Sequence, residues 1–243
     1  YLAFAELYYL QNKIEEAHEN IKKVRNINSM LKSKGEETIP ELEILEIEIR
    51  VHCAQNKPDE AKDKLIKQSE FFISNWEKAK YYRLLAAIEK HEMNYGKAKK
   101  ALKSSLEIIK EIGACPISDK LLYSELLIEM SRIGNKRAYK EATRNLIELE
   151  AKIKEKRLPA LNLEMKIQKG YLALVGSSYD DAYKIFSEIV QEADKNRLYR
   201  QKSKALEAIA SIETQGHLLS ESTREKSVYR YLDDARRILE EYS

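Results

Sequence analysis

The sequence contains few of the residues that break helices. Only seven glycines and four prolines occur among 243 residues, and these two residue types are the ones that most disfavour a helix interior. No stretch shows the alternation of apolar and polar residues, with a period of two, that a half-buried strand requires. Lys, Glu, Leu, Ile and Ala, which favour helices, are abundant. The composition therefore predicts an all-α fold.

Cysteine and long apolar runs are also scarce. The two cysteines, Cys53 and Cys115, form no CxxC pair, so neither a disulfide framework nor a zinc site is indicated. Two isolated thiols in a chain rich in Lys and Glu suit a reducing compartment, and we expect a cytoplasmic protein. No apolar run reaches the roughly 18 residues needed to cross a membrane, and no signal peptide is visible. We therefore expect no membrane partner.

Neither sign of charge dominates. The chain has 43 Lys and Arg against 40 Asp and Glu, for a net charge of +3. The basic excess lies in the middle of the chain, over residues 61–180, and is typical of a solvated helix surface. A surface that binds nucleic acid normally carries a larger excess of Lys and Arg, so we do not expect a nucleic-acid partner.

The motifs of the common enzyme and cofactor sites are missing. Neither GxxxxGK[ST] nor GxGxxG occurs, so no phosphate-binding loop is predicted. His52 and Cys53 are adjacent, but neighbouring residues on a helix point about 100° apart, so one metal ion cannot easily use both. We interpret His52 as a packed side chain, and Cys53 has no evident base to activate it. None of the histidines belongs to an HExxH pair: His18, His52, His91 and His217. The sequence predicts a non-enzymatic protein without a cofactor or a metal site.

Short polar turns separate stretches in which apolar residues recur at helical spacing. An alanine recurs near the start of every second helix, at Ala17, Ala61, Ala98, Ala142, Ala182 and Ala235. The repeat is thus about 40 residues long. Just before one of these alanines, Ser178 and Asp181 have the spacing of a helix N-cap. We expect about six antiparallel helix pairs in a single domain over 1–243, with units at 1–35, 40–76, 78–113, 118–157, 159–196 and 197–243.

The spacing of small and bulky residues in these units resembles the tetratricopeptide repeat. In that repeat, small residues let the two helices of a pair approach closely, and aromatic or Leu side chains fill the space between them. The residues that carry the resemblance are Tyr1, Phe4, Ala5, Tyr8, Ala17 and Ile21 in the first unit, Tyr82, Leu85, Ala86, Ala98 and Leu102 in the third, and Gly170, Ala182 and Phe186 in the fifth. Ile49 and Met130 stand where a small residue belongs, and every period exceeds 34 residues. The chain is therefore similar to the divergent, long-repeat type found in helical-repeat domains of signalling ATPases and of maltose-activator-like transcription regulators.

The resemblance implies an α-α superhelix, a TPR-like solenoid whose first helices line a concave groove. A protein or peptide partner would lie in that groove, and the chain would act as a protein–protein interaction scaffold. Tyr9 and Tyr171 fall outside the packing positions of the repeat and are candidate contacts, since interfaces favour Tyr. Arg50, Arg83 and Lys90 could receive acidic groups of the partner. The full predicted lining is Tyr9, Glu46, Arg50, Arg83, Lys90, Leu127, Ser131 and Tyr171.

An alternative function is a sensor. The chain begins with Tyr1, inside a helical pattern, so we expect a piece of a longer protein. In that protein the repeats could form a regulatory domain in which a peptide or small ligand changes the shape of the array. A third class, an enzyme or a nucleic-acid binder that uses the basic middle, has the least support in the sequence.

Overall fold

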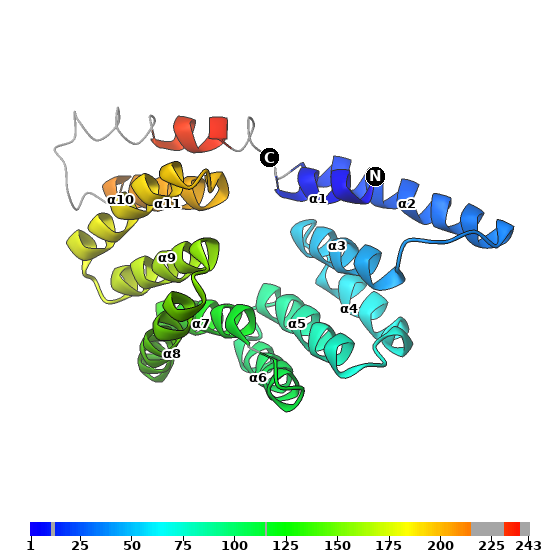
Figure 1. The fold of residues 1–243 in the computed structure, drawn as a ribbon, viewed down its shortest axis with the longest axis horizontal. Helices are drawn as coiled ribbons and strands as arrows, with labels where there is room; N and C mark the ends of the chain where they lie inside the picture. The colour runs from blue at the N-terminus through cyan, green and yellow to red at the C-terminus, as the bar shows by residue number, and fades with distance from the viewer. Residues whose placement is uncertain (11–12, 115, 215–230, 239–243) are drawn as a thin grey trace. The chain divides into compact units, whose positions relative to one another are not determined.

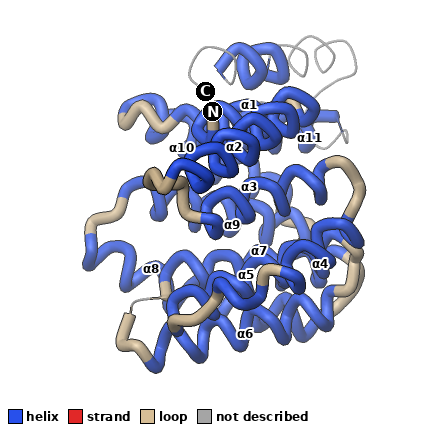
Figure 2. Tube along the Cα trace, turned by 90° about the vertical axis from the view of Figure 1, so that its right-hand side faces the viewer, coloured by secondary structure: helices blue, strands red, loops and turns tan. Residues whose placement is uncertain are grey.

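The computed structural model describes residues 1–10, 13–114, 116–214 and 231–238, and these residues contain helices and loops only (Figure 2). The helices are α1 (Leu2–Leu10), α2 (Ile14–Lys34), α3 (Glu41–Ala54), α4 (Pro58–Lys67), α5 (Asn75–His91), α6 (Tyr95–Glu111), α7 (Ile117–Arg132), α8 (Lys136–Lys156), α9 (Pro159–Val175), α10 (Tyr179–Lys195) and α11 (Tyr199–Thr214), with a short 3-10 turn η1 (Ser69–Phe71). Residues 231–238 are also helical. The expected all-α fold of adjacent helix pairs is confirmed.

The helices form two compact units, residues 1–119 and 120–243. In the first unit, α1 pairs with α2, α3 with α4 and α5 with α6, and the first helices α1, α3 and α5 contact one another in order (Figure 1). In the second unit, α9 packs against both α8 and α10, and α11 packs against α9 and α10. The first helices α1, α3 and α9 are therefore each packed against their own partner helix and against the first helix of the next pair.

Local signals explain where several helices begin and end. Pro58 and Pro159 occupy the first turn of α4 and α9, where the missing N–H costs nothing. Ser74 starts α5 with a complete capping box, because its hydroxyl accepts from the Glu77 N–H and the Glu77 carboxylate accepts from the Ser74 N–H. Ser178 occupies the N-cap position of α10, as predicted, but its side chain accepts no hydrogen bond from the first turn of the helix.

The alanines that define the repeat all lie in the core. Ala17, Ala61, Ala98, Ala142 and Ala182 are completely buried. The complete burial of these alanines agrees with the small residue that the repeat requires where its two helices pack together.

In the fifth pair, a glycine lies directly against an aromatic ring. A Cβ atom added to Gly170 would lie 2.6 Å from Cζ of Phe186, which is itself completely buried. The small position and the aromatic residue that the repeat pattern assigned to this pair thus meet directly.

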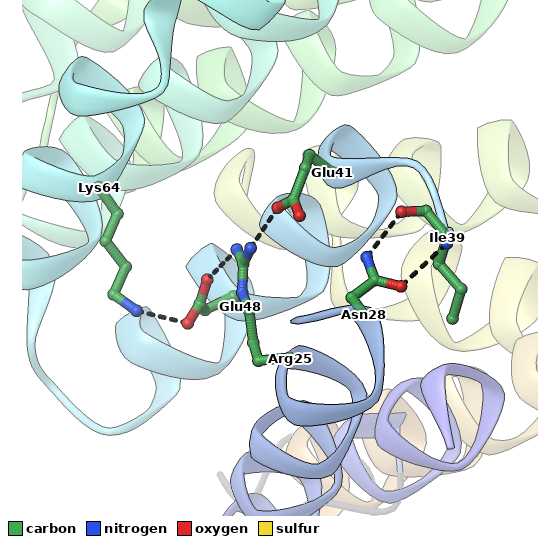
Figure 3. A network of polar contacts seen from close by, with 6 residues as sticks. All are labelled: Arg25, Asn28, Ile39, Glu41, Glu48 and Lys64. Carbon is green, nitrogen blue, oxygen red and sulfur yellow. Dashed lines mark hydrogen bonds and ion pairs between the residues drawn. The ribbon is translucent and has the colours of Figure 1, made fainter. Parts of the chain in front are cut away.

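In the first unit, polar contacts join three successive helices (Figure 3). Arg25 of α2 pairs with Glu41 and, at 2.8 Å, with Glu48 of α3, and Glu48 also pairs with Lys64 of α4. Burial alone would raise the pKa of Glu48, but the hydrogen bonds and charges of Lys64 and Arg25 outweigh it and lower the pKa. The carboxylate is thus ionised and held between two cations.

Beside this network, Asn28 of α2 holds the loop that leads into α3. Its Nδ2 donates to the Ile39 carbonyl at 2.8 Å, and its Oδ1 accepts from the Ile39 N–H at 2.9 Å (Figure 3). Asn28 is buried, so these bonds replace water for both backbone groups.

Candidate functional site

The predicted contact residues of the first unit are engaged within the protein. Arg50 pairs with Glu46 on the same helix and lies 4.0 Å from Glu6 of α1. Glu46 also pairs with Lys80 of α5 at 2.5 Å. This alternating chain of charges connects α1, α3 and α5. A partner would have to compete with these pairs in order to use the Arg50 guanidinium.

Arg83 is held from two sides. Its guanidinium lies 3.5 Å from a carboxylate oxygen of Asp119 and 5.7 Å from the ring centroid of Trp76. Asp119 is buried and accepts a second bond from the Ser105 hydroxyl at 2.8 Å. Arg83 therefore has a structural role that the sequence pattern did not reveal.

The other two candidates of the first unit differ in their surroundings. Tyr9 packs against the core cluster of the first helix pair, which contains Ala5, Ala17 and Ile21. Lys90 is half-buried on α5. The two residues lie on different helices of the unit, α1 and α5.

In the second unit, the prediction for Leu127 is wrong. Its side chain has no exposed surface, so it belongs to the core and cannot line a groove. Ser131, one turn further along α7, is almost buried and donates its hydroxyl proton to the Leu127 carbonyl at 2.7 Å. Tyr171 is half-buried on α9. Ser131 and Tyr171 line the same pocket.

That pocket has a volume of about 800 Å³ and lies between α7, α9 and α11, the first helices of three successive pairs. We call it the α7–α9–α11 pocket. Its lining alternates apolar and polar groups: Glu125, Ile128, Glu129, Ser131, Arg132, Glu164, Ile167, Gln168, Tyr171, Leu174, Val175, Tyr179, Lys204, Glu207, Ala208, Ser211 and Ile212.

Tyr171 connects the pocket to the core. One side of its ring packs edge to face against Phe186, with centroids 5.3 Å apart. The Arg132 guanidinium lies over the ring, 5.1 Å from the centroid, a typical cation–π distance. Arg132 also pairs with Glu129 at 2.9 Å. The aromatic ring is therefore fixed in place by its neighbours.

Acidic groups outnumber basic groups in the lining. Glu125, Glu129, Glu164 and Glu207 stand against Arg132 and Lys204. Lys204 is already paired with Glu164 at 2.7 Å, across the gap between α11 and α9. Both cations of the pocket therefore have carboxylate partners from the protein itself, and the pocket keeps a net negative charge.

Sequence reasoning missed most of this site. It took no residue from the sixth unit, although Lys204, Glu207 and Ser211 on α11 line the pocket. It also passed over Gln168, which lies three positions before Tyr171 on the same helix. Residues three or four apart share a helix face, so this spacing could have identified Gln168.

The residues considered for chemistry lie elsewhere. Cys53 is buried, and burial together with the charge of Glu92 raises the pKa of its thiol to about 11. His52 is also buried, as predicted, and its ring packs against His18 with centroids 5.8 Å apart. Cys115 and His217 lie outside the described residues.

The part of the chain that the structure describes contains neither a candidate metal site nor a membrane-spanning helix. Within residues 1–10, 13–114, 116–214 and 231–238, no group of three or more His, Cys, Asp and Glu side chains could hold a metal ion. In the same part of the chain, no helix combines the length and the apolar character needed to cross a bilayer.

Comparison with known proteins supports the fold. No protein-family model matches the chain, and no curated protein matches its sequence. The structure is similar to the crystal structure of BtubC (BKLC) from P. vanneervenii, with a TM-score of 0.58 and 12% sequence identity over 96% of this chain and 93% of that one. At this identity the likeness shows a shared all-α fold and carries no function across.

Proposed function

We propose that the chain is a non-catalytic, TPR-like helical-repeat scaffold of the cytoplasm that binds a segment of a partner protein in the α7–α9–α11 pocket. The observation that supports it is the convergence of three first helices on one pocket of about 800 Å³. First helices of successive repeats are the elements that line the binding face in such arrays. The half-buried Tyr171 gives the pocket an aromatic contact, of the kind enriched at interfaces.

A selection from a phage-displayed library of random dodecapeptides tests this function. The immobilised chain should enrich peptides that bind the wild-type protein and lose binding to the Tyr171→Ala variant. The matched control is Arg144→Ala, which changes an exposed residue of α8 outside the pocket. Circular dichroism would verify that both variants fold. Enriched peptides that bind Tyr171→Ala as well as the wild type would contradict the proposal.

A second candidate is the sensor function, in which the pocket takes a small ligand. Its volume lies within the range of about 300–1,000 Å³ typical of small-molecule sites. A ligand that binds only the folded state raises the unfolding temperature. A thermal-shift screen of metabolites, repeated with Tyr171→Ala, would identify such a ligand by a shift seen only in the wild type. A peptide selection that fails while this screen succeeds would favour the sensor.

A further inference from the structure

We propose that the α7–α9–α11 pocket selects a positively charged side chain, Arg or Lys, of the partner segment, and that it holds this side chain beside Glu207, Gln168 and Tyr171. This inference rests on the proposed function and names the chemistry of the partner. Two observations, on ion pairing and on a buried acceptor, point to a cationic N–H donor as the ligand group, and the charges around Tyr171 agree with them.

The first observation is the unequal pairing of charges. Arg132 pairs with Glu129, and Lys204 pairs with Glu164. Glu207 is exposed and forms no ion pair with any described residue. It accepts only a hydrogen bond of 3.3 Å from the Ser203 hydroxyl. Glu207 is therefore the carboxylate of the pocket that can take a cation from a partner without breaking a pair inside the protein.

The second observation is a buried acceptor without a donor. Gln168 lines the pocket and is only 4% exposed. Its Nε2 donates to the Leu121 carbonyl at 3.0 Å, which fixes the orientation of the amide, while its Oε1 accepts no hydrogen bond from the described residues. Buried acceptors are rarely left without a donor. The oxygen itself is buried, so the five N–H donors of a guanidinium or the three of an ammonium would reach it only when the side chains of the lining adjust on binding.

The charges around the Tyr171 ring agree with these two observations. Burial raises the pKa of Tyr171, and the charge of Glu207 raises it further. Arg132 opposes this effect, whereas Glu164 and Glu129 add to it. The carboxylates thus outweigh the arginine at this ring, as they do in the lining as a whole. A cation entering here would be attracted, and an acidic side chain would be repelled.

The size and arrangement of the pocket suit such a side chain on a peptide. A volume of about 800 Å³ exceeds the needs of one side chain, so neighbouring residues of the segment have room to pack on Ile128, Ile167 and Leu174. The guanidinium of Arg132 already lies over the Tyr171 ring at 5.1 Å. Because Arg132 already lies over the ring, the partner's cation would lie beside Tyr171, near Glu207, and not over the ring.

Matched small probes test the charge requirement directly. N-acetyl-arginine amide and N-acetyl-citrulline amide have nearly the same shape, but only the first is charged. We expect N-acetyl-arginine amide to shift the NMR signals of the Gln168 side-chain amide and of Tyr171 in a saturable way, and citrulline to bind at least about tenfold more weakly. Glu207→Gln should reduce the arginine affinity about tenfold, to the level of citrulline, because it removes the unpaired charge. Glu188→Gln, an exposed site on α10 outside the pocket, should leave it unchanged. Equal binding of the two probes, or no shift at Gln168 and Tyr171, would overturn the inference.

The peptides selected with the library separate this inference from the proposed function. Peptides that need Tyr171 and are enriched in Arg or Lys would support both, and Glu207→Lys should then reverse the preference towards Asp and Glu. Peptides that need Tyr171 but show no enrichment of basic residues would leave the function standing and overturn the charge assignment. The absence of any peptide that depends on the pocket would count against the function itself.

Discussion

The contact between Gly170 and Phe186 allows a sharp test of how the fifth helix pair is packed. In a Gly170→Ala variant, the new methyl group would lie 2.6 Å from Cζ and 2.9 Å from Cε1 and Cε2 of the ring. The ring is completely buried among residues such as Ile167 and Ile189, so it cannot move aside without displacing them.

The magnitude follows from two opposing terms. Overpacking a core by a methyl group costs about 1–3 kcal/mol. The replacement of Gly by Ala inside a helix raises the free energy of unfolding by about 0.8–1 kcal/mol, because Ala has the higher helix propensity. The difference is about 0–2 kcal/mol. Because a distance of 2.6 Å to a completely buried ring is a severe overlap, we expect the upper half of this range, a loss of about 1–2 kcal/mol in the free energy of unfolding, measured by urea denaturation followed by circular dichroism. The displaced ring should also disturb Tyr171, which packs against Phe186, so peptide binding should weaken as well.

A control and a double mutant make the result decisive. A Cβ atom added to Gly96, in the first turn of α6, meets nothing within 4 Å, so Gly96→Ala should not destabilise the protein and should raise the free energy of unfolding by up to about 1 kcal/mol. The smaller side chain of Phe186→Leu should make room for the methyl group of Gly170→Ala, so the double mutant should lose at least about 0.5 kcal/mol less than the sum of the single changes. A Gly170→Ala protein as stable as the wild type, or strictly additive losses, would refute the close packing.

Three further predictions concern the first unit. Asn28→Ala removes both hydrogen bonds to Ile39 and should lower the free energy of unfolding, measured in urea, by about 2–3 kcal/mol. A loss below about 0.5 kcal/mol, the size of an ordinary surface change, would show that water replaces the side chain. Because the folded-state pKa of Glu48 is lowered from its ordinary value of 4.5, its contribution to stability is present above pH 4.5 and is lost as the pH falls through the folded-state pKa. Glu48→Gln should therefore flatten the acid limb of the stability curve, and an unchanged limb would count against the ion pairs. The Cys115→Ser substitution leaves Cys53 as the single thiol. Because this thiol is buried and its pKa is about 11, it should react with Ellman's reagent at neutral pH only after denaturation. Rapid labelling of the native protein would disprove its burial.

The helix pairs and their packing positions could be predicted from the sequence because their causes are local. Sparse Gly and Pro confine the breaks to turns, and the helical period places apolar residues on one face. The alanines that open the second helices are buried as the pattern requires. Gly170 and Phe186 meet because a small residue and a bulky one must complement each other wherever two helices cross closely.

The binding surface depended on contacts that no local pattern encodes. The resemblance to the tetratricopeptide repeat placed Arg83 in a groove, but its guanidinium pairs with Asp119, 36 positions later in the sequence. Leu127 was assigned to the same groove, but its side chain is fully buried, and a shift of one residue on a helix turns a side chain by about 100°, which decides between surface and core.

The sequence by itself thus determined the helices, their pairing and the residues that let them approach. Only the tertiary structure decided which polar side chains remain available, because Lys204 meets Glu164 across 40 positions while Glu207, one turn further along α11, meets no cation among the described residues. Pairing between charges depends on distances of a few ångströms between helices that are remote in sequence, and those distances are fixed only when the core packs.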